Sequence, residues 1–179
     1  MKKSINRLFS ILAVISILLN THCKKNNSEE INADTSSEVQ NAVITEKDIT
    51  TLNITEFALS DQSESIAESW DKFKTLLNHM EDLKKGSFSF FKDDKALLQS
   101  FLTDLKVEIP EKLNKPSVLV RISAYETVLY KFDEAANIQN SNKEVLLNNI
   151  KDILLSFNNL VYQINKEVER DSQNIVKPQ

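Results

Sequence analysis

The stretch PSVLVRISAYETVLYKFDEAANIQNSNKEVLLNNIKDILLSFNNLVYQINKEVER, residues 116–170, decides the fold. Apolar side chains recur in it at steps of three and four residues, the spacing that lines one face of an α-helix. The pattern predicts one helix over about 116–136 and a second over about 142–170. The repeating residues are Val118, Ile122, Tyr125, Leu129, Phe132 and Ala136, then Leu146, Ile150, Ile153, Phe157, Leu160 and Ile164. Further apolar residues widen the face of the last helix, which predicts contact with two or more neighbours.

The ends of these two helices carry their own signals. Pro116 stands at the start of the first, where a missing N–H is not needed. Residues 137–140 are expected to form a turn, and Ser141 with Glu144 has the spacing of a capping box ahead of the second helix. A connection this short predicts that the two helices are antiparallel neighbours.

Two further helices are expected on the N-terminal side. The first spans about 62–85, and Gly86 predicts its end because it follows two lysines and reaches a left-handed conformation cheaply. The second spans about 93–108 and ends before Pro110, which disfavours helical geometry at the residue preceding it. Their apolar stripes are Ile66, Trp70, Phe73, Leu77 and Met80, then Leu97, Phe101, Leu105 and Ile109. The chain is therefore predicted to be all-α, an up-down antiparallel bundle of about four helices.

The remaining segments of the predicted domain are connections. The Phe-rich connector at 87–91 is expected to close one end of the core. Residues 49–60 alternate partly between apolar and polar side chains, which favours an extended lead-in across the bundle, with a short helix as the alternative. The bundle domain is thus placed at 49–172, and residues 173–179 are interpreted as a polar tail.

The N-terminus has the pattern of a targeting segment. Lys2, Lys3 and Arg7 precede an apolar run at 8–19. A run of this length is too short to span a bilayer of about 30 Å as a helix. A basic start followed by a short apolar run is typical of a secretory signal peptide, predicted here at 1–22. A signal anchor or a buried helix is the alternative.

Cys23 follows directly and is the one Cys of the chain. The segment LNTHC, residues 19–23, resembles the lipobox of bacterial lipoproteins, although that family favours a small residue at the position of His22. The resemblance implies that Cys23 is lipidated and becomes the mature N-terminus. An ordinary secreted protein with a free thiol is the alternative. Residues 24–48 are polar and lack aromatics, so 23–48 is predicted to be a lipidated, disordered tether.

Composition excludes several classes of function. One Gly leaves no phosphate-cradling loop, and one Cys leaves no internal disulfide and no Cys-based metal site. The net charge is -4, and no basic stretch beyond the leader is flanked by aromatics, so nucleic-acid binding is not expected. No metal, cofactor or catalytic residue is predicted. The acidic groups at 29–30, 93–94 and 167–171 lack the spacing of a calcium loop and are interpreted as solvated faces or helix-end charges.

A few side chains stand out as candidates for binding a partner. Arg121 is the one Arg between the leader and Arg170, and it either binds an anion or partner or forms an ion pair within the bundle, for example with Glu126. Tyr130 and Tyr162 lie off the main stripes and are candidate interface residues. Trp70 and Tyr125 fall on the stripes and are expected in the core. His79 is interpreted as a surface or rim residue.

The layout as a whole resembles the small helical lipoproteins of unknown function found in flavobacteria and other Bacteroidetes. The residues that carry the resemblance are the leader with Cys23, the tether, and the segments SWDKF, FSFFKDDKALLQSFLTDL, IPEKLNKPSVLVRISAYETVLYKFDEA and FNNLVYQINKEVERD. The expected protein is a non-enzymatic envelope lipoprotein, held at the outer membrane by its lipid, whose helical head binds an envelope protein. A small-ligand or lipid carrier is the alternative. An enzyme that uses carboxylates or Lys alone is a third hypothesis.

Overall fold

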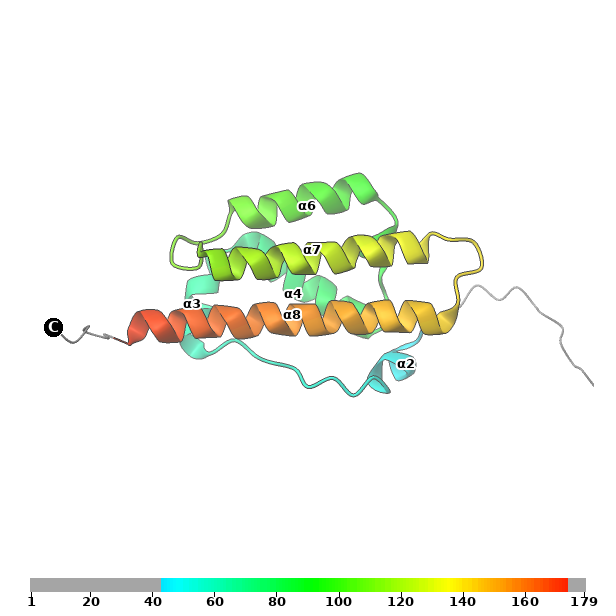
Figure 1. Cartoon of the computed structure of the whole chain (residues 1–179), viewed down its shortest axis with the longest axis horizontal. Coiled ribbons are helices and arrows are strands. Elements are labelled where there is room, and N and C mark those ends of the chain that lie inside the picture. The colour runs from blue at the N-terminus through cyan, green and yellow to red at the C-terminus, as the bar shows by residue number, and fades with distance from the viewer. Residues whose placement is uncertain (1–42, 174–179) are drawn as a thin grey trace, which may run out of the picture. The chain divides into compact units, whose positions relative to one another are not determined.

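The computed structural model describes residues 43–173, and within that range the chain is all-helical, with seven helices and no strand. Figure 1 shows the long helices lying alongside one another. The helices are α2 (Glu46–Thr50), α3 (Asp61–Ala67), α4 (Asp71–Lys84), α5 (Ser89–Lys92), α6 (Lys95–Val107), α7 (Pro116–Ala136) and α8 (Lys143–Ser172). The predicted all-α class is confirmed. None of these helices is both long and apolar enough to cross a membrane.

The pair α7 and α8 forms the main contact of the fold, and both helices begin and end within two residues of the predicted bounds. They lie side by side in Figure 1, joined by a short turn at one end. The predicted stripe of α8 is buried throughout, and that of α7 is buried from Val118 to Phe132. Tyr125 is fully buried, as predicted, and its hydroxyl donates to the sulfur of Met80 over 3.0 Å.

The cap of α8 differs from the predicted capping box. Asn142 is the N-cap, and its side chain accepts a hydrogen bond from the Glu144 N–H over 2.8 Å. The Ser141 hydroxyl donates instead to the carbonyl of Ile138 over 2.8 Å and to that of Ala135. Those carbonyls belong to the end of α7 and the turn after it, so Ser141 stabilises the turn while Asn142 begins the helix.

The prediction of one continuous helix over 62–85 is wrong, because this segment is divided into α3 and α4. Trp70 leaves helical geometry, with φ -101° and ψ 82°, and precedes the first residue of α4. Its fully buried indole donates to the carbonyl of Leu105 over 2.9 Å. That carbonyl lies in the last turn of α6, where it has no partner within its own helix. The break therefore lets Trp70 enter the core and satisfy the end of another helix.

The break also changes which residues of this region are buried. The predicted stripe included Ile66 and Leu77, and both are only half-buried. Ala67 and Leu76 are buried in their place. Since the break ends the helical phase of α3, one continuous 3.6-residue periodicity does not describe the whole segment.

Gly86 ends α4 as the sequence predicts. Its φ is +85°, its N–H donates to the Leu83 carbonyl, and the Ser87 N–H donates to the Asp82 carbonyl, both over 2.9 Å. This is the pair of bonds of a Schellman motif. A Cβ at this position would lie 2.9 Å from the carbonyl oxygen of Ile44, so the backbone of the N-terminal segment also requires Gly here.

The Phe-rich connector is partly helical, since residues 89–92 form α5. Phe91 is buried, and the Phe88 ring meets the Phe132 ring edge-on at 5.6 Å between centroids, so the connector does cover part of the core. Helix α6 has the predicted extent within two residues. Leu97, however, was predicted in its apolar stripe and is 55% exposed, because Leu98 and Leu102 turn inward beside Phe101 and Leu105.

The N-terminal side is ordered earlier than predicted. The tether was expected to reach Asp48 and the extended lead-in to begin at 49, whereas residues 46–50 form α2. Thr45 caps this helix by accepting from the Asp48 N–H, and the Asp48 carboxylate accepts in return from the Thr45 N–H over 2.9 Å and pairs with Lys143 over 2.8 Å. The hydrogen bond from Lys143, helped by those from Thr45, lowers the pKa of Asp48 to about 2. Buried Ile44 and Ile49 complete the attachment of α2.

Residues 53–60 are not helical, as the lead-in prediction requires, and we call this segment the strap. It connects α2 to α3 along the side of the helices, as Figure 1 shows. The signal peptide at 1–22, Cys23, residues 24–42 of the tether and residues 174–179 of the tail lie outside the described residues.

Candidate functional site

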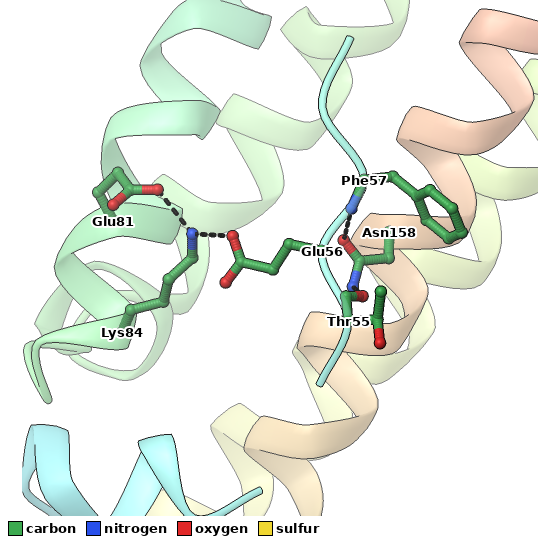
Figure 2. A network of polar contacts seen from close by, with 6 residues as sticks. All are labelled: Thr55, Glu56, Phe57, Glu81, Lys84 and Asn158. Atoms are coloured by element: carbon green, nitrogen blue, oxygen red, sulfur yellow. Dashed lines mark hydrogen bonds and ion pairs between the residues drawn. The ribbon is translucent and has the colours of Figure 1, made fainter. Parts of the chain in front are cut away.

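The strap runs between α4 and α8 at residues 55–57, where Glu56 points to α4 and Phe57 points away from it, on the side of α8 (Figure 2). Glu56 points to α4 and accepts a hydrogen bond from Lys84 over 2.7 Å, and Glu81 binds the same ammonium over 2.7 Å. Burial works against the charged form of Lys84, but the hydrogen bonds to Glu56 and Glu81 outweigh it and raise the pKa of this group. The strap is therefore tied to α4 by a shared ion pair.

Two asparagines of α8 hold the backbone of the strap. Asn158 donates to the Thr55 carbonyl over 2.8 Å and accepts from the Phe57 N–H over 3.2 Å. Asn165 donates to the Ala58 carbonyl over 2.8 Å and accepts from the Ser60 N–H over 2.9 Å. Each side-chain amide thus pairs with a C=O and an N–H two residues apart, as a neighbouring β-strand would. We call Asn158 and Asn165 the asparagine clamp.

The spacing of the clamp matches the spacing of the strap. Seven residues of α-helix advance by about 10.5 Å, and three residues of extended chain advance by about 10 Å. The two asparagines are seven residues apart, and the two strap segments that they bind are three residues apart. Both amides therefore meet the strap in the same register, and four strap backbone groups are satisfied without a β-sheet.

An open groove of about 340 Å³ lies beside the strap, within the range of roughly 300–1,000 Å³ that is usual for ligand sites. Residues of the strap, α3, α4 and α8 line it. Its apolar walls are Phe57, Leu59, Ala67, Phe73, Leu77, Phe157 and Val161. Phe73 of α4 stacks on Phe157 of α8 with 6.3 Å between ring centroids, which forms a rigid base. The break between α3 and α4 allows α3 to form one side of this groove.

Three charged residues stand among the lining residues, and their balance is negative. Glu64 and Glu68 come from α3 and its C-cap, are exposed, and take part in no ion pair within residues 43–173. Lys74 comes from α4 and is paired with Asp71 over 2.7 Å. Since the Lys74 charge is already neutralised, the two carboxylates set the electrostatic character of the opening.

Tyr162, one of the predicted interface residues, does not line this groove but lies beside Phe57, which does. Its ring is 5.5 Å from that of Phe57, the aromatic residue of the strap that lines the groove. Tyr162 is 45% exposed and Phe57 is 48% exposed, so the pair presents aromatic surface to solvent. The Lys166 ammonium lies 5.8 Å from the centre of the Tyr162 ring. The binding role of Tyr162 stays a prediction.

Arg121 and Tyr130 do not line the groove. Arg121 is exposed on α7 and forms no ion pair within residues 43–173. The alternative in which Glu126 pairs with Arg121 is wrong, because Glu126 binds Lys106 and accepts a hydrogen bond from the Tyr130 hydroxyl over 3.1 Å. Burial, followed by the contact with Glu126, raises the pKa of Tyr130. Tyr130 is therefore engaged within the bundle.

Three of the acidic residues singled out in the sequence have structural partners, while residues 29–30 lie outside the described residues. Asp94 caps α6 by accepting from the Leu97 N–H over 2.9 Å. Glu167 is buried and is bound by Ser117, Gln163 and Arg170, while Glu169 pairs with Lys166 over 2.7 Å. No group of three potential metal ligands occurs among the residues that the structure describes.

His79 is more enclosed than the sequence suggested. Its ring stacks on Phe90 with 3.6 Å between centroids, and the rings of Phe91 and Phe101 lie edge-on at 6.2 and 5.9 Å. Burial lowers the pKa of His79, although Asp82 acts in the opposite direction. The residue is a partly buried member of an aromatic cluster, and the sequence spacing alone did not indicate this, because α5 brings two of the rings.

His79 should make stability depend on pH. The pKa of His79 in the folded protein is lower than its unfolded value of about 6.5, so the unfolded chain binds a proton more readily. The contribution of the neutral His79 to the free energy of unfolding is therefore fully present above pH 6.5 and is lost as the pH falls from there toward the folded pKa. We expect the urea midpoint of the wild type to decline more between pH 7.5 and 5.5 than that of His79→Phe. Both proteins share the same carboxylates, so parallel pH curves for the two would contradict the assignment.

The groove with its clamp and strap is the candidate binding site. Sequence reasoning missed Asn158, Asn165, Glu64 and Glu68. The seven-residue spacing of the two asparagines is no specific signal, because Asn142 and Asn149 have the same spacing. Comparison with protein-family models, curated proteins and solved structures found no match. The resemblance to Bacteroidetes lipoproteins therefore stays a prediction.

Proposed function

We propose that this protein is a membrane-tethered envelope lipoprotein whose helical head is a non-enzymatic binding module. The strapped groove is the observation that carries the proposal, because it combines an apolar base, exposed aromatic edges and charged groups at one opening. The leader at 1–22 and Cys23 supply the anchor, and the polar residues after Cys23 separate the head from the membrane surface. An envelope protein is the proposed partner.

In this proposal, α4, α6, α7 and α8 act as an up-down antiparallel four-helix scaffold. Support comes from the packing of α7 on α8 and of α6 on both α4 and α7, together with the ring contact between Phe73 of α4 and Phe157 of α8. The scaffold carries the core, and the strap and α3 lie beside it. Binding surfaces on segments added to a rigid scaffold are common, because the scaffold fixes the geometry of the site.

The anchor is tested by replacing Cys23 with Ser. We expect the wild type to sediment with membranes and to incorporate a labelled acyl chain, and Cys23→Ser to lose the label and appear in the soluble fraction. Several buried acyl chains hold a protein firmly, since each CH₂ contributes about 0.8 kcal/mol. Because the chain has one Cys, the label has a single candidate site. A variant that stays membrane-bound without the label would overturn the lipoprotein proposal.

The binding role of the groove is tested by filling it. Ala58 lines the groove from the exposed strap, so Ala58→Trp adds bulk there without entering the core. Ala124→Trp, at an exposed position of α7, is the matched control. In cross-linking of intact membranes, we expect the control to retain an envelope protein adduct that Ala58→Trp loses. Equal adducts in both variants would place the partner elsewhere.

A small-ligand or lipid carrier is the second candidate function. The volume of the groove favours it, because a cavity of about 150 Å³ already binds a benzene ring when its walls are apolar. In this case, native mass spectrometry of the protein from its own membranes should show a bound small molecule that Ala58→Trp lacks. Absence of a ligand from both proteins would favour the protein-binding role.

A further inference from the structure

We propose that the groove takes an apolar group that carries a cationic head, such as an alkyl or aryl ammonium. This inference rests on the proposed binding role of the groove and specifies the chemistry of its ligand. The apolar part would cover the accessible area of Phe57, Leu59 and Leu77 in the groove, and the head would lie at the opening.

The apolar part of the ligand is indicated by the buried base. Phe73 is fully buried, and Phe157 and Val161 are 8% and 2% exposed, so these side chains are fixed before a ligand arrives. Leu77 is half-buried and Phe57 half-exposed, which leaves apolar area for a ligand to cover. Covering such area is favourable in proportion to the area removed from water.

The cationic head is indicated by the charges and the aromatic edge. Glu64 and Glu68 are four residues apart, so they stand one turn apart on the same side of α3. An ammonium group would meet two carboxylates that have no ion-pair partner within residues 43–173. The ring of Phe57, which lines the groove and is 48% exposed, adds an aromatic face that attracts a cation.

An anionic head fits this opening less well. The single cation of the lining, Lys74, already binds Asp71 over 2.7 Å. A carboxylate ligand would have to share Lys74 with Asp71 and would also face Glu64 and Glu68. Like charges at short range oppose binding, so the two carboxylates discriminate against anions as well as favour cations.

The experiment compares three probes of equal chain length: hexyltrimethylammonium, 1-hexanol and hexanoate. Binding to the full chain in lipid nanodiscs is measured by calorimetry, with empty nanodiscs as the blank. We expect the ammonium to bind about tenfold more tightly than the alcohol, since two exposed charge pairs together contribute about that factor, and hexanoate to bind most weakly. Added salt should reduce the advantage of the ammonium.

Two double variants distinguish the contribution of the carboxylates from that of the apolar groove. Glu64→Gln with Glu68→Gln should lower the ratio of hexyltrimethylammonium affinity to hexanol affinity from about tenfold to about one, and any change of the groove that affects both probes equally cancels in this ratio. Glu134→Gln with Glu144→Gln removes two exposed charges from outside the groove and should keep the preference. Equal binding of all three probes, abolished by Ala58→Trp, would overturn the cationic head but retain the groove as a site. No binding of any probe would overturn this inference, while the cross-linking experiment decides the protein-binding role separately.

Discussion

Trp70→Ala is expected to lower the free energy of unfolding by about 3–5 kcal/mol, the usual cost of deleting a buried large aromatic. Trp70 is fully buried and stacks on Phe73 with 4.8 Å between ring centroids. Its removal leaves a cavity between α4 and α6. It also leaves the Leu105 carbonyl without its hydrogen bond from the indole. Urea unfolding followed by circular dichroism measures the change.

A second substitution at the same position separates packing from hydrogen bonding. Trp70→Phe keeps most of the apolar contact but cannot donate to Leu105, so we expect a loss of about 1–3 kcal/mol from the unsatisfied carbonyl and the reduced volume. Tyr162→Ala, which removes a 45% exposed ring, is the control and should cost much less than Trp70→Ala. If Trp70→Ala and Tyr162→Ala had equal effects, Trp70 would not be central to the core.

Trp70 also links the core to the candidate site. Because its buried position accompanies the break between α3 and α4, the side chain helps to place Ala67 and Glu68 on the wall of the groove. We therefore expect Trp70→Phe to weaken binding of hexyltrimethylammonium under conditions where the variant remains folded. The core substitution would then alter binding although Trp70 does not line the groove.

Replacing both clamp residues, Asn158→Ala with Asn165→Ala, is expected to release the strap. The double variant loses four hydrogen bonds, each with a net contribution of about 1 kcal/mol, although solvent can rehydrate part of the exposed strap. The exchange of the Phe57 and Ser60 amides with deuterium should therefore be at least about tenfold faster, because each 1.4 kcal/mol corresponds to a factor of ten. Amides in the middle of α7 should keep their protection.

The single variant Asn158→Ala tests whether the strap opens as one unit. If it does, the Ser60 amide should exchange faster although its own acceptor, Asn165, is unchanged. Asn159→Ala removes an exposed Asn beside the clamp and is the matched control, with no expected change in the strap amides. Fast exchange of Phe57 and Ser60 in the wild type would contradict the clamp.

The prediction of the helices succeeded where the local signal and the tertiary contacts agree. Helices α7 and α8 combine a long 3.6-residue apolar period with clear end signals, so their extents follow from the sequence. The end of α4 at Gly86 was predictable for the same reason, because the positive φ that ends the helix is a local requirement that Gly meets. At 62–85 the apolar period was equally regular, and no Pro or Gly marks the break. The division of this segment into two helices therefore could not be predicted from the local pattern. The hydrogen bond that accompanies this break is to Leu105, which lies 35 residues away.

The residues of the candidate site also differ in whether the local sequence could indicate them. Tyr162 was recognisable as an aromatic residue off the main stripe, and its ring lies beside that of Phe57, which lines the groove. The asparagine clamp was not recognised, because an Asn on a helix face says nothing about which distant backbone it binds. Ser141 and Asn142 show the same limit at short range: both can cap a helix, and the carbonyls at the end of α7 and in the following turn bind one of them.

The sequence by itself determined that the described part of this protein is helical, where its longest helices lie and that its one Gly ends a helix. Those properties depend on neighbours within a few residues, through apolar periodicity, caps and backbone sterics. Only the tertiary structure decided the break at Trp70, the path of the strap and the existence of the groove. Each of these depends on hydrogen bonds and packing between residues 35 to 107 positions apart, which a local pattern does not encode.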